Sequence, residues 1–169
     1  MTPGTPKPQQ PLPIRRGQES AVHSLIDRCY REYGLSLNLA DPCEHHLADP
    51  GAYFRSRGGE FWVVHDESGL IRATVALHIR AATLGGANLA ELKSLYVDPA
   101  WRRQGWGRRL SLMVMDAARA APSREMELWS DTRFTAAHSL YESLGFIRFS
   151  RRDIEDSNQS SEWGYRRAL

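Results

Sequence analysis

The sequence predicts a single domain of the mixed α/β class, and three observations support this. The chain has 169 residues and is 41% hydrophobic, which is enough for one full core. Segments with the two-residue period of strands are interspersed with segments of helical period. Around residues 95–110 an apolar strand runs through a proline turn and two glycines directly into a helical pattern. Residues 1–13 hold five prolines and are expected to form a disordered tail, so the domain is expected to span residues 14–169.

The first half of the domain is predicted to contain two helices and a hairpin. Apolar residues from Val22 to Tyr30 recur at helical spacing, and Gly34 follows as a stop signal. Glu67-Ser68-Gly69 forms a turn between two apolar runs. The expected elements are a short strand at 14–16, helices at 18–33 and 42–57, and strands at 60–65 and 70–80.

The second half alternates between strands and helices. Leu110, Val114, Ala117 and Ala118 are spaced to form the inner face of a long helix, and Pro122 ends that segment. A glycine cap at Gly145 separates a shorter helix from the strand that follows it. The expected elements are a loop at 84–88, a strand at 89–97, helices at 105–121 and 134–144, and strands at 126–129, 146–152 and 163–167.

The strand-to-helix junction at residues 102–109 has the composition of an anion-binding loop. Gly105 and Gly107 leave room for backbone N–H groups to converge on a phosphate, and four arginines surround them. The helix that follows adds its unpaired N-terminal donors. The segment is not a P-loop, because G-x-x-x-x-G-K-[ST] is absent, and it is not a Rossmann fingerprint, because Leu110 stands where the third glycine would be.

Two motifs in this order resemble those of the GNAT superfamily of acyl-CoA-dependent N-acyltransferases. Arg102-x-x-Gly105-x-Gly107 resembles the family's R/Q-x-x-G-x-G/A signature, and residues 136–146 resemble its later A-x-x-L-Y-x-x-x-G-F element. The resemblance implies a mixed, mostly antiparallel central sheet that is flanked by helices. It also implies that the fourth and fifth strands splay apart.

The resemblance further implies a binding site for acetyl-CoA as co-substrate, with no metal. Backbone groups that are left unpaired at the splayed strand end would bind the pantetheine arm, and the glycine loop would bind the pyrophosphate. A backbone N–H near Val97 would stabilise the oxyanion. The expected cofactor-binding residues are Leu95, Tyr96, Val97, Arg102, Arg103, Gln104, Gly105, Trp106, Gly107 and Arg108.

Two residues are predicted to be catalytic. Tyr141 matches the family tyrosine that protonates the departing thiolate, although its spacing would also suit core packing. Glu91 is the candidate general base, slightly preferred over Glu127 and Asp131, and burial in a cleft should raise the pKa of its carboxyl. Strict alternation would place Glu91 and Lys93 on one face of their strand and Tyr96 on the other.

The expected activity is acetyl transfer to a primary amine of a small molecule, such as an amino acid. Arginines, aromatics and a carboxylate on the expected substrate side fit an amine that carries its own carboxylate. These residues are Tyr30, Tyr33, Tyr53, Phe54, Arg55, Arg57, Glu162, Trp163 and Tyr165. Phe134 departs from the family pattern, because many relatives have an asparagine there that contacts the cofactor. The alternatives are a protein acetyltransferase acting on lysine or an N-terminus, and a non-catalytic acyl-CoA sensor.

Composition narrows the setting of this activity. A net charge of +2 gives no basis for nucleic-acid binding, and no segment is long and apolar enough for a membrane span. Without a signal-peptide core, a cytoplasmic location is expected. Cys29 and Cys43 are expected to be reduced thiols rather than a disulfide framework, and a homodimer is compatible with the resemblance.

Overall fold

The computed structural model of the chain describes residues 9–82 and 86–169. Most of the predicted proline-rich tail (residues 1–8) and part of the predicted loop at 84–88 lie outside the described residues. The end of the predicted tail is ordered, because Leu12–Pro13 forms β1 and pairs with β2. Ile14, which was predicted to begin the first strand, follows β1, is buried and donates its N–H to the Phe61 carbonyl. The tail boundary predicted at residue 13 was therefore too late.

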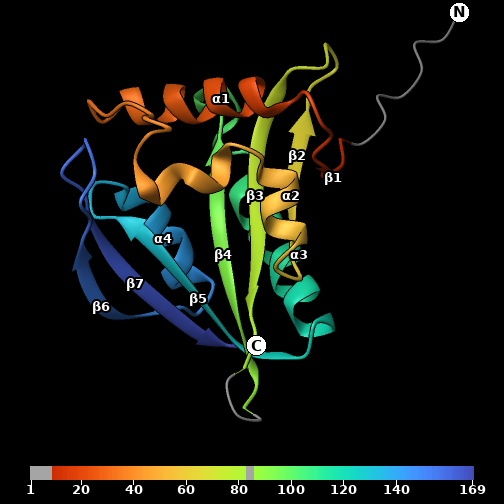
Figure 1. The fold of residues 1–169 in the computed structure, drawn as a ribbon, viewed down its shortest axis with the longest axis vertical. Coiled ribbons are helices and arrows are strands. Elements are labelled where there is room, and N and C mark those ends of the chain that lie inside the picture. The colour runs from red at the N-terminus through yellow and green to blue at the C-terminus, as the bar shows by residue number, and fades with distance from the viewer. Residues whose placement is uncertain (1–8, 83–85) are drawn as a thin grey trace, which may run out of the picture.

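Within residues 9–82 and 86–169, seven strands form one sheet in the order β1-β2-β3-β4-β5-β7-β6 (Figure 1). All neighbouring pairs are antiparallel except β4 and β5, which run parallel. This confirms the predicted mixed, mostly antiparallel sheet. The other strands are β2 (Glu60–His65), β3 (Ile71–Arg80), β4 (Asn88–Val97), β5 (Ser123–Asp131), β6 (Ile147–Asp153) and β7 (Ser161–Ala168).

Helices cover both faces of the sheet and bury two hydrophobic cores. On one face lie α1 (Glu19–Arg31), the 3₁₀ helix η1 (Pro42–Leu47) and α2 (Pro50–Arg55), and on the other lie α3 (Trp106–Ala120) and α4 (Thr135–Ser143). A second 3₁₀ helix, η2 (Pro99–Trp101), follows β4. The predicted helix at 42–57 is two helices, because Pro50 opens a new one that Asp49 caps through the Ala52 N–H, 2.9 Å away.

The parallel strands β4 and β5 splay apart, as the resemblance implied. Within the described chain, β4 pairs with β5 only from Asn88 to Glu91. The remaining part of β4, from Leu92 to Val97, pairs only with β3. One edge of this strand end is therefore free of a neighbouring strand and faces a cavity.

A β-bulge at Ser94 interrupts the alternation of β4. Ser94 has a φ of +52°, and the register with β3 shifts at this point. Leu92 and Leu95 consequently pack into the same core, beside α3 and α4, although they are an odd number of residues apart. Tyr96 packs into the opposite core, beside α1. The prediction of strict alternation was wrong, and the bulge is the reason.

Candidate active site

A cavity of about 730 Å³ lies between the splayed ends of β4 and β5. β4 supplies one wall from Glu91 to Val97, and β5 supplies another from Trp129 to Asp131. The loop before α3 and the face of α4 close one end. Residues from α1, η1 and the β6–β7 connection close the other end, namely Tyr30, Tyr33, Glu44, His46, Asp156, Asn158 and Ser160. The cavity therefore has two ends of different chemistry that meet at β4.

The loop end is built to hold an anion. Gly105 caps α3 with a φ of +82°, a conformation that strains any residue with a Cβ. The first N–H groups of α3 have no partner within the helix, and the cap residue offers no side chain to them. Trp106, Gly107 and Arg108 carry these donors and line the cavity. This arrangement fits the pyrophosphate of a nucleotide carrier.

Other residues of the predicted loop have different roles. A Cβ on Gly107 would lie 3.0 Å from Leu140 Cδ2, so this glycine, which lines the cavity, also allows α3 to approach α4 closely. The exposed Gln104 donates its side-chain amide to the Ala100 carbonyl and does not line the cavity. Arg103 has a φ of +60° and does line it.

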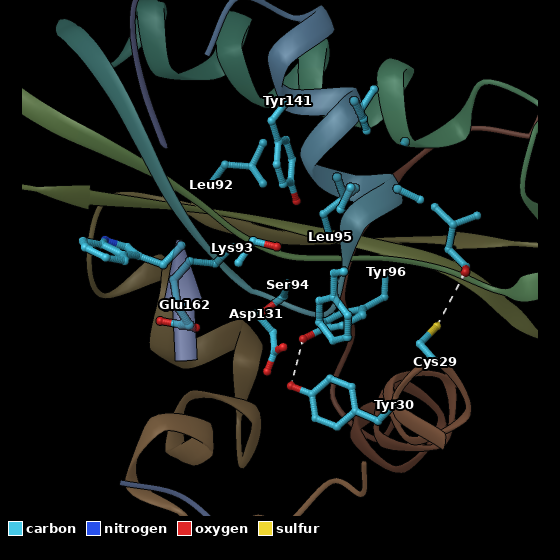
Figure 2. A pocket seen from close by; sticks show the side chains of 18 of the residues that line it. Cys29, Tyr30, Leu92, Lys93, Ser94, Leu95, Tyr96, Asp131, Tyr141 and Glu162 are labelled. Atoms are coloured by element: carbon cyan, nitrogen blue, oxygen red, sulfur yellow. Dashed lines mark hydrogen bonds between the residues drawn. The ribbon is translucent and has the colours of Figure 1, made fainter. Parts of the chain in front are cut away.

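Arg102 lines the cavity, but its guanidinium is engaged by protein groups. It donates two hydrogen bonds to the Glu32 carboxylate at the end of α1, at 2.7 and 2.9 Å, and a third to the Val97 carbonyl at 3.1 Å. The thiol of Cys29 donates to the same carbonyl (Figure 2). Only part of the strand end is therefore available for an added pantetheine arm, since the Val97 carbonyl already has partners.

Tyr141 projects from α4 into the middle of the cavity (Figure 2). Its ring packs against Phe146 and Tyr165, and only 5% of the residue is exposed. Burial, with a contribution from Tyr165, raises the pKa of the Tyr141 hydroxyl well above its usual value. The hydroxyl therefore stays protonated at neutral pH and can donate a proton to a leaving thiolate.

Glu91 also lines the cavity, but its electrostatics are the reverse of those predicted. Its carboxylate lies 3.4 Å from both His78 Nδ1 and Lys93 Nζ, and 3.8 Å from Arg80 Nε. Burial acts to raise the pKa of Glu91, but these three neighbours outweigh it and lower the pKa to about 2. The expected raised pKa was wrong, because the sequence did not show that Lys93, Arg80 and His78 all lie around this carboxylate.

The two other candidate bases are also neutralised by cations. Glu127 lies outside the cavity lining and accepts hydrogen bonds from Arg80, Arg166 and the Trp129 indole. Asp131 lines the cavity, but its carboxylate accepts hydrogen bonds from Arg133 Nε at 2.8 Å and from Arg133 Nη2 at 2.6 Å. Burial opposes these contacts, yet the pKa of each carboxyl stays below its usual value.

Glu44 is a carboxylate that the sequence did not single out as part of the site. It lies on η1, lines the cavity and accepts a 2.8 Å hydrogen bond from the Tyr30 hydroxyl. Burial raises the pKa of this carboxyl despite the hydrogen bond. The neighbouring His46 donates its Nδ1–H to the Cys43 carbonyl, so its Nε2 faces the Ser94 hydroxyl at 3.3 Å as an acceptor. His46 thereby ties η1 to the bulge in β4.

The chain matches a known protein family. The family model of the acetyltransferase (GNAT) domain matches residues 57–148, more than half of the chain. The chain belongs to the GNAT family. It is therefore an N-acetyltransferase that acts with acetyl-CoA, and the resemblance carried by the two motifs is confirmed.

This GNAT acetyltransferase is also similar to individual proteins in sequence or in fold. The chain is 29% identical over 145 residues to the uncharacterised N-acetyltransferase YjgM of Escherichia coli. This alignment covers 82% of this chain and 83% of the relative. An acetyltransferase structure from Streptococcus agalactiae superposes with a TM-score of 0.79 at 21% identity, over 96% of this chain and 99% of the other. A Salmonella typhimurium acetyltransferase in complex with acetyl-CoA has a TM-score of 0.69 at 17% identity, over 95% and 94%.

The structure places three of the nine residues that were predicted on the substrate side in the cavity lining. Tyr30, Tyr33 and Glu162 line the cavity, whereas the other six predicted residues do not. Those six are engaged in core packing or surface contacts elsewhere; Arg55, for example, pairs with Glu60, and Tyr165 is fully buried. They are Tyr53, Phe54, Arg55, Arg57, Trp163 and Tyr165.

Phe134, which replaces the family asparagine, forms an aromatic wall of the cavity. Its ring packs edge-on against Tyr33, with ring centroids 4.9 Å apart. It also packs against the tilted ring of Tyr30, with centroids 6.0 Å apart. The residue thus offers no hydrogen bond and fixes the tyrosine that contacts Glu44. In the part of the chain that the structure describes, no helix could cross a membrane, and no cluster of three or more acidic, histidine or cysteine side chains is placed to hold a metal.

Proposed function

We propose that this acetyltransferase transfers the acetyl group of acetyl-CoA to the primary amine of a small molecule, such as an amino acid or a related amine. The observation that carries the small-molecule assignment is a bridge of hydrogen bonds across the acceptor end of the cavity. Asn158 and Ser157 of the β6–β7 connection bond to Ser36 and Asp41 of the α1–η1 connection. The distances range from 2.6 to 3.2 Å.

This bridge favours a compact acceptor. A protein or peptide substrate needs an open groove through which its chain can enter and leave. Here the two connections that flank the acceptor end are tied together, and Figure 1 shows them side by side at the end of the sheet. A small amine fits a cavity closed in this way.

Charge at the same end favours an amine that carries a carboxylate. Glu44 and Asp156 line this end, and their negative charge favours the entry of a substrate ammonium group. Lys93 lies across the cavity, and its 3.4 Å contact with Glu91 leaves ammonium protons for a substrate carboxylate.

Tyr141 is proposed to act as the general acid in a direct transfer. The amine attacks the thioester carbonyl, the C–N bond forms as the C–S bond breaks, and the thiolate takes the Tyr141 proton. Glu91 has too low a pKa to be an effective base near neutral pH, and we assign it the positioning of Lys93.

The test is release of free thiol from acetyl-CoA in the presence of amino acids, polyamines, aminoglycosides and short peptides, with mass spectrometry of the products. Acetylation of a small amine, with no acetylation of peptides, is expected. Turnover on peptides alone would refute the small-molecule assignment. Binding of CoA without turnover on any amine would favour the sensor alternative.

A further inference from the structure

Two tyrosine hydroxyls and a carboxylate form a continuous hydrogen-bonded chain at the acceptor end of the cavity. The Tyr96 and Tyr30 hydroxyls are 3.1 Å apart, and the Tyr30 hydroxyl is 2.8 Å from Glu44 Oε1. All three residues line the cavity, and they come from β4, α1 and η1. Figure 2 shows the two hydroxyls facing each other.

Counting protons fixes the direction of this chain. An ionised carboxylate can only accept a hydrogen bond, so the single proton of the Tyr30 hydroxyl is donated to Glu44. The shorter, charge-assisted bond to Glu44 takes precedence over the bond between the tyrosines. Tyr96 must therefore donate to Tyr30, which leaves a lone pair on the Tyr96 oxygen for a proton from the cavity.

The bulge in β4 makes this arrangement possible. Without it, Tyr96 would lie on the face of α3 and α4 and could not contact Tyr30 on α1. With it, the Tyr96 ring packs edge-on against Tyr30, with centroids 5.8 Å apart. Burial is the main cause of the raised pKa of the Tyr96 hydroxyl, and Tyr141 is near enough to add to it. Tyr141 and Tyr96 therefore belong to one cavity.

We propose that Tyr96, Tyr30 and Glu44 form a proton relay that deprotonates the substrate ammonium. This rests on the proposed function. One ammonium proton passes to the Tyr96 oxygen, the Tyr96 proton passes to Tyr30, and the Tyr30 proton passes to Glu44. The products are a neutral amine and a neutral Glu44 carboxylic acid. Tyr96 is the catalytic residue of the relay, and Tyr30 and Glu44 act through it.

The groups around Glu44 suit it to receive a proton. Tyr30 faces it from α1, Lys93 from β4, Asp41 from the α1–η1 connection and Asp156 from the β6–β7 connection. Cys43 adjoins it on η1. Burial, with the two aspartates, outweighs Tyr30 and Lys93, so the carboxyl holds a proton more readily than an exposed glutamate does.

The test compares pH–rate profiles of kcat/KM for an active amine in wild type, Glu44→Gln, Tyr30→Phe and the double variant. The two conservative single replacements keep the side-chain volumes. Each is expected to reduce kcat/KM near pH 7 at least about tenfold, and Glu44→Gln is expected to remove the acidic limb. The double variant should lose no more than the single variants, because a relay broken twice is no worse than one broken once.

Tyr53→Phe is the matched control, since Tyr53 lies outside the cavity lining and its replacement should leave the profile of wild type. Multiplying effects in the double variant, or an acidic limb that persists in Glu44→Gln and disappears in Glu91→Gln, would overturn the relay. Absence of amine-dependent turnover in wild type would instead refute the proposed function.

Discussion

Glu91 and Tyr96 lie on the same face of β4 although they are five positions apart, an odd interval that strict alternation would place on opposite faces. Glu91 contacts His78, which packs beside Tyr53 of α2, and Tyr96 packs beside Tyr30 of α1. The bulge at Ser94 causes this. It brings the charged residues of the strand and the Tyr96 hydroxyl to the acceptor side, while Leu92 and Leu95 remain in the core under α3 and α4.

The loop before α3 should lose affinity for acetyl-CoA when Gly105 is changed. Gly105→Ala forces a Cβ onto a residue with a φ of +82°, which costs about 1 kcal/mol or more and shifts the N–H groups that follow. We expect the Kd for acetyl-CoA, measured by calorimetry, to rise several-fold. Gly69→Ala is the control, because Gly69 has a φ of +86° in the β2–β3 turn, away from the cavity. Equal loss of affinity in both variants would contradict a local role.

Arg102 and Glu32 should behave as one unit. Because both side chains are more than a third exposed, their pairing is expected to stabilise the fold by only about 0.5–1 kcal/mol. Its larger effect should be on acetyl-CoA, through the position of the Val97 carbonyl. We expect Arg102→Gln, Glu32→Gln and the double variant to weaken acetyl-CoA binding to similar extents. If Arg102→Gln alone weakens it, Arg102 binds the phosphates directly, as its motif predicted.

Replacing Glu91 should change how stability depends on pH. Its pKa in the folded protein, about 2, is below the usual glutamate value of 4.5, so its contribution is present above pH 4.5 and is lost as the pH falls through 2. Glu91→Gln should lower the free energy of unfolding at pH 7 by about 1–3 kcal/mol. The deficit should shrink in melts at lower pH. Glu125→Gln, on the exposed side of β5, is the control, and an identical response would contradict this account.

Removing the hydrogen bonds between the β6–β7 and α1–η1 connections should change the KM for the amine and not the KM for acetyl-CoA. Asn158→Ala removes both hydrogen bonds to Ser36. We expect the KM for the amine to rise several-fold while the KM for acetyl-CoA stays within about twofold. Asn88→Ala is the control, since Asn88 ties a different loop, through Ala82. A rise in both KM values would show that the bridge supports the whole fold and not the acceptor end.

The fold and the cofactor end were predictable because they depend on local sequence. Gly105 and the start of the helix that follows form the candidate anion site within a few residues, and Tyr141 lies in a motif whose strand–helix order is fixed. The acceptor end depends on contacts between distant segments. The surroundings of Glu44 arise where η1, α1 and β4 meet, whereas the sequence predicted only that this residue lies within a helix at 42–57. The bulge at Ser94 had no signal either, because serine is neither glycine nor proline.

The role of the Tyr141 hydroxyl can be measured by comparing amine-dependent thiol release from acetyl-CoA in wild type and in Tyr141→Phe. Phenylalanine keeps the packing against Phe146 and Tyr165 and removes only the proton donor. We expect kcat to fall at least about tenfold in Tyr141→Phe while the Kd for acetyl-CoA stays unchanged. A Tyr141→Phe variant with wild-type kcat would contradict this role, because the buried hydroxyl in the cavity would then have no part in the transfer.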